Sequence, residues 1–156
     1  VSSSRGNMPF AEEIIAKLLE DYNVFIIYGS NKRLFKSLSK LSSARLKLFS
    51  WYENVWELVS LASIIVTKPG GLTIFEGLFM KKFFIFTHYI PGQEEENMKV
   101  LISKGLAHYA PDKEQFLAAV SLFSKKAATA EGSYALEVKD MGEVFAAKLN
   151  EVMLDG

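Results

Sequence analysis

The sequence predicts an α/β protein built on a doubly wound parallel sheet, and two observations carry this prediction. Short β-branched and aromatic runs recur along the chain, and most are continuously apolar, as strands buried on both faces are. Segments with helical spacing of apolar residues lie between these runs. This alternation is typical of a parallel sheet with helices on both faces, and we expect about six strands in one sheet.

The expected strands are short, and most are continuously apolar. They span residues 24–28, 46–49, 63–67 and 83–87, with a weaker strand over 106–109. Val1 is expected to be the last residue of a truncated first strand, which would complete the sheet. Helical periodicity predicts helices over residues 10–20, 32–41, 73–80, 94–104 and 113–123.

The last part of the chain has a different pattern. Residues 124–133 show little apolar periodicity, which predicts the end of a helix and a linker. Residues 136–153 regain helical spacing, and this terminal helix could pack on the same domain or reach towards another one. With 156 residues in all, we expect a single domain over residues 1–156.

The composition narrows the function classes. Eighteen Lys and Arg residues balance eighteen Asp and Glu residues, which argues against broad nucleic-acid binding because that usually requires a basic excess. The absence of cysteine rules out disulfides and thiolate metal sites and fits a reducing compartment. Neither His88 nor His108 has a partner at metal-ligand spacing, so we expect no metal site. No apolar run approaches the roughly 20 residues of a spanning helix.

Topology predicts where a ligand binds, because open parallel sheets hold ligands at the carboxyl ends of their strands. The loop over residues 68–73 connects a buried strand to a helix at that edge. Gly70 and Gly71 would let the backbone approach a ligand, and the free N–H groups of the following helix favour an anion such as a diphosphate. The alternative is a tight turn that needs positive φ. The residues alone leave both interpretations open.

Glu76, three residues after Thr73, also has two interpretations. Thr-x-x-Glu is the pattern of a capping box, in which the carboxylate satisfies a backbone N–H at the helix start. A carboxylate here could instead accept the two hydroxyls of a ribose, as acidic residues do in nucleotide-binding folds. The spacing favours the cap and the preceding glycines favour the ribose, so this choice also stays open.

Two further loops are expected on the same edge of the sheet. Residues 2–6 contain three serines, an arginine and a glycine, a set of groups that suits a phosphate. Residues 91–97 open a helix with three successive glutamates, and the later two are expected to complement the helix dipole. Gln93 and Glu94 lie nearer the loop and are candidates for binding sugar hydroxyls.

The segments 68–76 and 91–97, separated by one strand, resemble the nucleotide-sugar half of GT-B glycosyltransferases. The resemblance is above all to the group of monogalactosyldiacylglycerol synthases and processive diacylglycerol glucosyltransferases. The N-acetylglucosaminyltransferase that forms lipid II is a more distant relative. The resemblance runs from residue 2 to residue 126 and implies a Rossmann-like doubly wound sheet, the C-terminal half of a GT-B fold.

The resemblance also implies a role for each matching position. The family's first glycine-rich loop corresponds to residues 2–6, with Ser4 and Gly6 at the diphosphate, although serines stand at two positions where glycines are usual. Backbone groups at Trp51 and Tyr52 would hold the uracil, but a serine precedes them where a glycine is common. The remaining assignments are the phosphate loop at Gly70, Gly71, Leu72 and Thr73, ribose binding by Glu76, and sugar binding by Gln93 and Glu94. Gly77 replaces a more usual alanine, which is expected to loosen its helix.

The activity that the resemblance implies is transfer of a sugar from a UDP-sugar to a lipid hydroxyl such as that of diacylglycerol. The helix N-terminus after Gly71 would stabilise the leaving UDP without a metal or other cofactor. The general base and most of the acceptor site belong to the family's N-terminal domain. We therefore expect a donor half that lacks this domain and works with it, or with a separate partner subunit. The two-subunit transferase of dolichol-linked N-acetylglucosamine synthesis has such a partner. The full-length enzyme is expected to be cytoplasmic and peripheral to a membrane, without a nucleic-acid partner.

Two other interpretations remain. The chain could be the UDP-sugar-binding half of another enzyme with this fold, either the lipid II-forming transferase or a UDP-N-acetylglucosamine 2-epimerase. The epimerase would need catalytic acids of its own in the cleft. The chain could also be a non-enzymatic Rossmann-like interaction domain, which would bind no nucleotide, so that a titration with UDP separates it from the enzymes.

Overall fold

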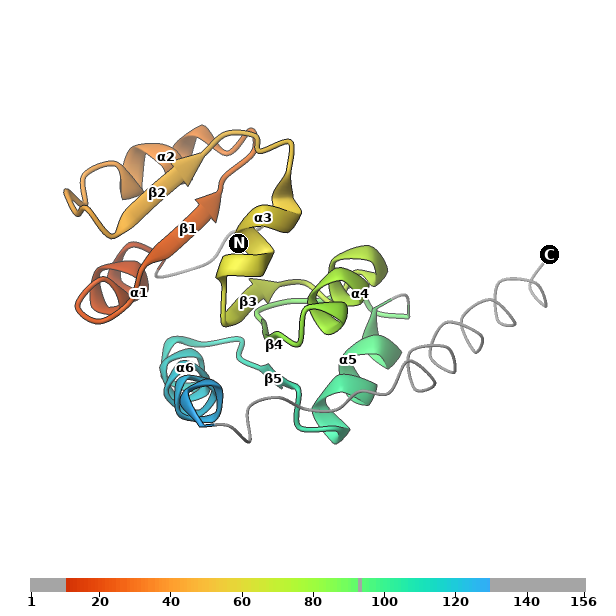
Figure 1. Cartoon of the computed structure of the whole chain (residues 1–156). Coiled ribbons are helices and arrows are strands. Elements are labelled where there is room, and N and C mark those ends of the chain that lie inside the picture. The colour runs from red at the N-terminus through yellow and green to blue at the C-terminus, as the bar shows by residue number, and fades with distance from the viewer. Residues whose placement is uncertain (1–10, 93, 130–156) are drawn as a thin grey trace.

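The computed structural model describes residues 11–92 and 94–129, in which helices and strands alternate (Figure 1). The five predicted strands are present, and every pairing between them is parallel, which confirms the α/β class. In chain order the elements are α1 (Ala11–Leu18), β1 (Val24–Ile27), α2 (Lys32–Leu38), β2 (Leu46–Phe49), α3 (Val55–Leu61), β3 (Ile64–Thr67), α4 (Gly71–Phe79), β4 (Phe83–Phe86), α5 (Glu95–Ser103), β5 (Ala107–Tyr109) and α6 (Lys113–Ala128).

Two helices differ from the prediction. Helix α3 is not among the predicted helices, and helix α6 continues through residues 124–128, where the sequence predicts a helix end and a linker. The lysines near the end of α6 complement the negative end of the helix dipole, which favours this extension. The expected first strand, the loop over residues 2–6 and the helix over 136–153 lie outside the described residues.

The described strands form two parallel sheets instead of the single sheet that was expected. One has the order β1-β2 and the other the order β3-β4-β5. In a doubly wound sheet, the strand that precedes the first helix lies in the middle, between the strands here called β1 and β3. A first strand in that place would join the two sheets, and this joining stays a prediction because residues 1–10 lie outside the described residues.

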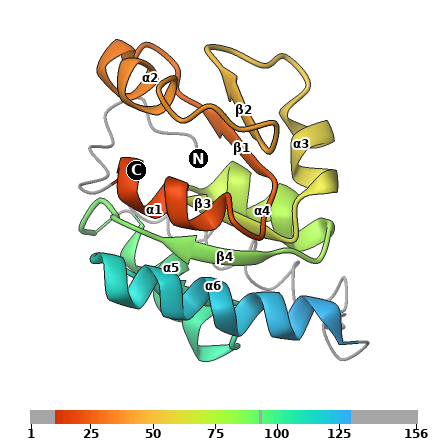
Figure 2. The same cartoon turned by 90° about the vertical axis from the view of Figure 1, so that its left-hand side faces the viewer.

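Helices cover both sides of the larger sheet. In Figure 1, α4 and α5 lie to the right of the strands and α6 lies to the left, and Figure 2 shows α1 and α6 in front of β3 and β4. An ion pair between Glu13 and Lys113 joins α1 to α6. Helix α1 also joins the two hydrophobic cores, because Ile14 belongs to the larger core and Ile15 to the smaller one.

Helix α4 packs very closely on the larger sheet at Gly77. A Cβ at this position would lie 2.5 Å from Cζ of Phe84 and 2.7 Å from Cδ1 of Ile65, both closer than real Cβ contacts allow. The absence of a side chain therefore permits this approach of α4 to β3 and β4. The expected loosening of the helix at Gly77 stays a prediction. Among the described residues, no helix combines the length and apolar character needed to cross a membrane.

Candidate functional site

The glycine loop brings an uncapped helix start to the carboxyl end of β3. Gly70 is the N-cap of α4, and no side chain caps this helix. The first intrahelical bond runs from the N–H of Ile74 to the carbonyl oxygen of Gly70. The N–H groups of Gly71, Leu72 and Thr73 therefore have no acceptor within the helix, which makes this end suitable for an anion.

The two glycines do not serve an unusual backbone conformation. Gly70 has φ −76° and ψ 138°, an extended conformation that any residue adopts, and Gly71 is the first helical residue. The glycines with positive φ are at other positions of the described chain. A Cβ on Gly71 would meet nothing within 4 Å. The positive-φ interpretation is therefore wrong, and the open space at Gly71 is what a ligand close to the backbone requires.

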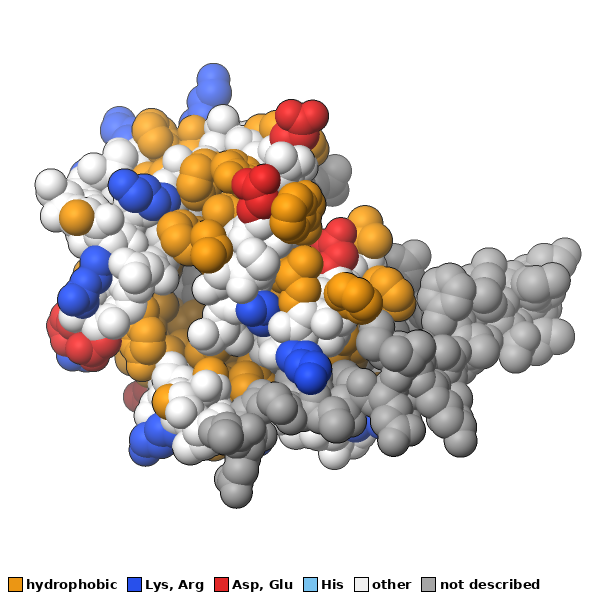
Figure 3. Space-filling view, in the orientation of Figure 1, with side chains coloured by type: hydrophobic (Ala, Val, Ile, Leu, Met, Phe, Trp, Pro, Cys, Tyr) orange, Lys and Arg blue, Asp and Glu red, His pale blue; other side chains and the backbone are white. Residues whose placement is uncertain are grey.

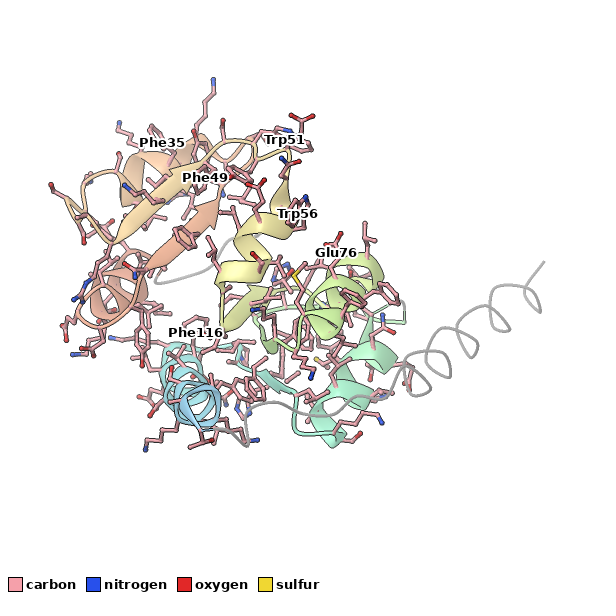
Figure 4. The ribbon with its side chains drawn as sticks, viewed as in Figure 1. Phe35, Phe49, Trp51, Trp56, Glu76 and Phe116 are labelled. Atoms are coloured by element: carbon pink, nitrogen blue, oxygen red, sulfur yellow. The ribbon has the colours of Figure 1, made fainter. Side chains whose placement is uncertain are left out.

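The structure rules out the capping box for Glu76. Because α4 begins at Gly71, Thr73 lies within the helix and is not its N-cap. Glu76 projects from α4 (Figure 4), and its partly exposed carboxylate makes no hydrogen bond or ion pair with any residue that the structure describes. Its acceptor capacity is therefore available to a ligand.

The side chains around this helix start are largely apolar. Leu72, in the first turn of α4, is 75% exposed, and Phe75 and Phe79 continue an exposed stripe at helical spacing. Figure 3 shows hydrophobic side chains gathered over α3 and α4. The polar groups that α4 presents near its start are therefore mainly the backbone N–H groups, Thr73 and Glu76.

Direct bonds join the glycine loop to the start of α5. Nζ of Lys68 lies 2.5 Å from Oε1 of Glu94, and the N–H of Ile90 donates to Oε2 of Glu94 at 3.0 Å. Nδ2 of Asn97 donates to the carbonyl oxygen of Pro69 at 3.2 Å. The loops that follow β3 and β4 therefore converge, as expected from their place at the carboxyl ends of neighbouring strands.

The proposed base-binding residues follow β2 and are far less enclosed. Trp51 is 80% exposed. The ring of Tyr52 packs edge-on against Phe49, and its hydroxyl donates to Oε2 of Glu57 at 2.9 Å. This hydrogen bond to Glu57 is the main cause that raises the pKa of Tyr52, with a smaller contribution from burial. Figure 4 shows Trp56 on α3 and Trp51 above it, before this helix begins.

The remaining predicted residues have different outcomes. Ser4, Gly6 and Gln93 lie outside the described residues, so their roles stay predictions. Lys68 and Asn97 belong to the two motifs but were not among the predicted site residues, and their bonds across the two loops show that they shape the site. In the described part of the chain, no cluster of three or more His, Cys, Asp and Glu residues is arranged to hold a metal ion.

Comparison with known proteins identifies sequence relatives among glycosyltransferases. A processive diacylglycerol beta-glucosyltransferase of Bacillus cytotoxicus is 34% identical over 112 residues, which cover 69% of this chain and 29% of the relative. One from Bacillus cereus is 32% identical over 123 residues, covering 76% of this chain and 32% of the relative. The chain thus spans about a third of the length of these curated relatives. No protein-family model matches the chain.

A solved structure has the same fold. The crystal structure of the glycosyltransferase of kitacinnamycin superimposes with a TM-score of 0.64 and 16% sequence identity, covering 84% of this chain and 34% of that one. It has a GT-B fold, so the predicted Rossmann-like fold is confirmed. The resemblance to the processive diacylglycerol glucosyltransferase group is confirmed as well.

Proposed function

We propose that this chain, a relative of GT-B glycosyltransferases, is the donor-binding part of an enzyme that transfers a hexose from a UDP-sugar to a lipid hydroxyl. The acceptor in the proposal is diacylglycerol or a glycolipid made from it, the substrate class named for the Bacillus relatives. The observation that carries the proposal is the uncapped start of α4 behind two glycines whose conformations do not require glycine.

The diphosphate would bind at this helix start. The N–H groups of Gly71, Leu72 and Thr73 are the proposed donors, and the positive end of the helix dipole adds to their attraction. When the bond between the sugar and the diphosphate breaks, negative charge grows on the leaving UDP. Donors that are already in place stabilise that charge without reorganising. No metal is required in this scheme.

The other parts of the donor would be held by neighbouring elements. Glu76, one turn further along α4, would accept the ribose hydroxyls, because its carboxylate has no partner in the described structure. Backbone groups at Trp51 and Tyr52 would hold the uracil, and Gln93 and Glu94 would contact the sugar. The resemblance supports each of these roles, and Ser4 and Gly6 would complete the phosphate site.

Catalysis in this proposal requires a second half. The attacking hydroxyl needs a general base, and the resemblance puts that base and the lipid site in an N-terminal domain or partner subunit. The relatives are about three times as long as the matched segment, which leaves room for such a domain. The complete enzyme would be cytoplasmic and would reach its lipid at a membrane surface.

The test is a calorimetric comparison of UDP, UMP and uridine. Because charge-assisted hydrogen bonds contribute about 1.5–3 kcal/mol each, UDP should bind at least about tenfold more tightly than uridine. Equal affinities would remove the phosphate role of α4. Gly71→Ala is the sharper variant, because the new methyl group would meet nothing within 4 Å in the free protein. This variant should leave the melting temperature unchanged or raise it, and it should lower the affinity for UDP.

A further inference from the structure

A buried carboxylate lies directly beside the start of α4. Glu94 is 5% exposed. Its Oε1 lies 3.6 Å from the place that a Cβ on Gly70 would occupy, and Gly70 is the N-cap of α4. In the proposed donor site, a diphosphate occupies this same helix start. A carboxylate next to a diphosphate is repelled by it, so the site needs a cation to offset the negative charge of Glu94.

Lys68 supplies that cation from the glycine loop itself. Its Nζ lies 2.5 Å from Oε1 of Glu94 and 3.9 Å from the position that a Cβ on Gly70 would occupy. The Glu94 side chain is 7% exposed, whereas that of Lys68 is 42% exposed. The ammonium group therefore lies between the buried carboxylate and solvent. An ammonium has three N–H donors, and Glu94 accepts from it at one oxygen only.

The carboxylate is also held in one orientation. Oε1 faces Lys68, and Oε2 accepts from the N–H of Ile90. Each carboxylate oxygen has two lone pairs, so each keeps capacity for one more donor, such as a sugar hydroxyl. Asn97, in the first turn of α5, also fixes the glycine loop, because its side chain donates to the carbonyl oxygen of Pro69.

We propose that Lys68 is a positioning residue of the donor site. It holds Glu94 over the glycine loop and offsets its charge, so that a carboxylate for the sugar and a diphosphate can occupy adjacent places. This inference rests on the proposed function. It assigns to Lys68 an action through Glu94, not a direct contact with the nucleotide.

The experiment uses four variants of this chain: Lys68→Met, Lys68→Arg, Glu94→Gln and the double variant Lys68→Met/Glu94→Gln. Lys99→Met is the matched control, because it also removes a lysine that pairs with glutamates near the start of α5, here Glu95 and Glu96 on the surface. Affinities for UDP and UDP-glucose are measured by calorimetry at low and at high salt, together with the melting temperature of each variant.

Lys68→Met should lower the affinity for UDP about tenfold at low salt, because it leaves the negative charge of Glu94 without a compensating cation beside the diphosphate. The loss should shrink at high salt. Lys68→Arg should stay within about twofold of wild type because it keeps the charge. The double variant should recover UDP affinity to within about threefold of wild type, because neither charge remains, yet lose the additional affinity for UDP-glucose. Lys99→Met should change the affinity for neither ligand.

A double variant that binds UDP as weakly as Lys68→Met would overturn the proposal, because Lys68 would then act on the nucleotide directly. The melting temperatures separate this failure from failure of the proposed function. Lys68→Met should lower the melting temperature and the double variant should restore part of it, whether or not UDP binds. If the wild-type chain does not bind UDP while this melting pattern holds, the proposed function fails and the pairing role of Lys68 stands.

Discussion

The two sheets of this chain differ in how completely their strands are covered. All four residues of β4 are buried between β3 and β5, whereas in β1 only Ile26 is buried. The larger core draws on α1, α4, α5 and α6, while the smaller core has three buried members, Ile15, Ile26 and Leu38, among the described residues. Similar apolar strand sequences thus acquire very different burial, depending on the neighbours that flank them.

The same difference separates the two parts of the candidate site. Bonds from Lys68 to Glu94 and from Asn97 to Pro69 join the residues proposed for the phosphate and the sugar across two loops of the larger sheet. The residues proposed for the base follow β2, and among the described residues the hydroxyl of Tyr52 bonds to Glu57, within its own segment. We infer that the phosphate end of the site is preorganised and that the base end adjusts when a ligand binds.

The largest expected effect compares the two cores directly. Phe84→Ala should lower the free energy of unfolding by about 3–5 kcal/mol, because it empties the centre of the larger core. Ile26→Ala should cost only about 2 kcal/mol, because the thinly covered smaller core can collapse around it. Urea unfolding measures both values. Equal losses would show that the smaller sheet is as firmly packed as the larger one.

The next effect concerns ligand binding on the larger sheet. Glu76→Ala should lower the affinity for UDP at least about tenfold, because each charged hydrogen bond contributes about 1.5–3 kcal/mol. It should also reduce the preference of the protein for UDP over 2′-deoxy-UDP. The melting temperature should hardly change, since Glu76 has no partner in the described residues. Glu96→Ala on α5 serves as a surface control. A lowered melting temperature with unchanged UDP affinity would show that Glu76 is structural.

The two glycines of α4 make a smaller but more selective comparison. Gly77→Ala would force a methyl group against Phe84 and Ile65 and should destabilise the protein by about 1–2 kcal/mol. Gly71→Ala in the same helix meets no neighbour and should not destabilise it. The pair is measured by thermal unfolding. A stabilised Gly77→Ala variant would mean that α4 can move away from its sheet at little cost.

The smallest effect is the titration of Tyr52 at the base end of the site. Its pKa is raised, mainly by the hydrogen bond to Glu57. A raised folded-state pKa means that this bond stabilises the fold below the unfolded value of about 10 and is lost as pH rises through the folded value. Phenolate absorbance of the wild type minus that of Tyr52→Phe isolates this group. Glu57→Gln should lower the Tyr52 pKa, and an unchanged value would remove the hydrogen bond as its cause.

Local patterns predicted the elements well where burial follows a simple period. The strand over 46–49 has the predicted bounds, because its apolar residues alternate around the exposed Lys47, the period of a half-buried strand. Helix α3 was not predicted, because its seven residues show no apolar face at helical spacing. Trp56 and Leu61 are exposed, and Val59 is the one buried residue of this helix. The capping box failed because the N-cap of the helix is Gly70, three residues before the Thr73 that the Thr-x-x-Glu pattern implies.

The split of the sheet and the Lys68–Glu94 pair could not be predicted in this way. Strand pairing depends on neighbours distant in the sequence, and the strand expected between β1 and β3 lies outside the described residues. Lys68 and Glu94 are 26 positions apart and meet only because β3 and β4 lie side by side. The convergence of their loops was predictable from topology, but the individual bond was not.

Helix α1 has a consequence for how the chain leaves the ribosome. Its Ile15 finds the smaller core once β1 and α2 have been made, but Ile14 belongs to a core completed by α6, and Glu13 pairs with a lysine 100 positions later. At about 5–20 residues per second, synthesis of that intervening stretch takes roughly 5–20 s. During this interval the nascent chain displays the apolar side of α1 that carries Ile14, and it is then that chaperones and proteases have their best access.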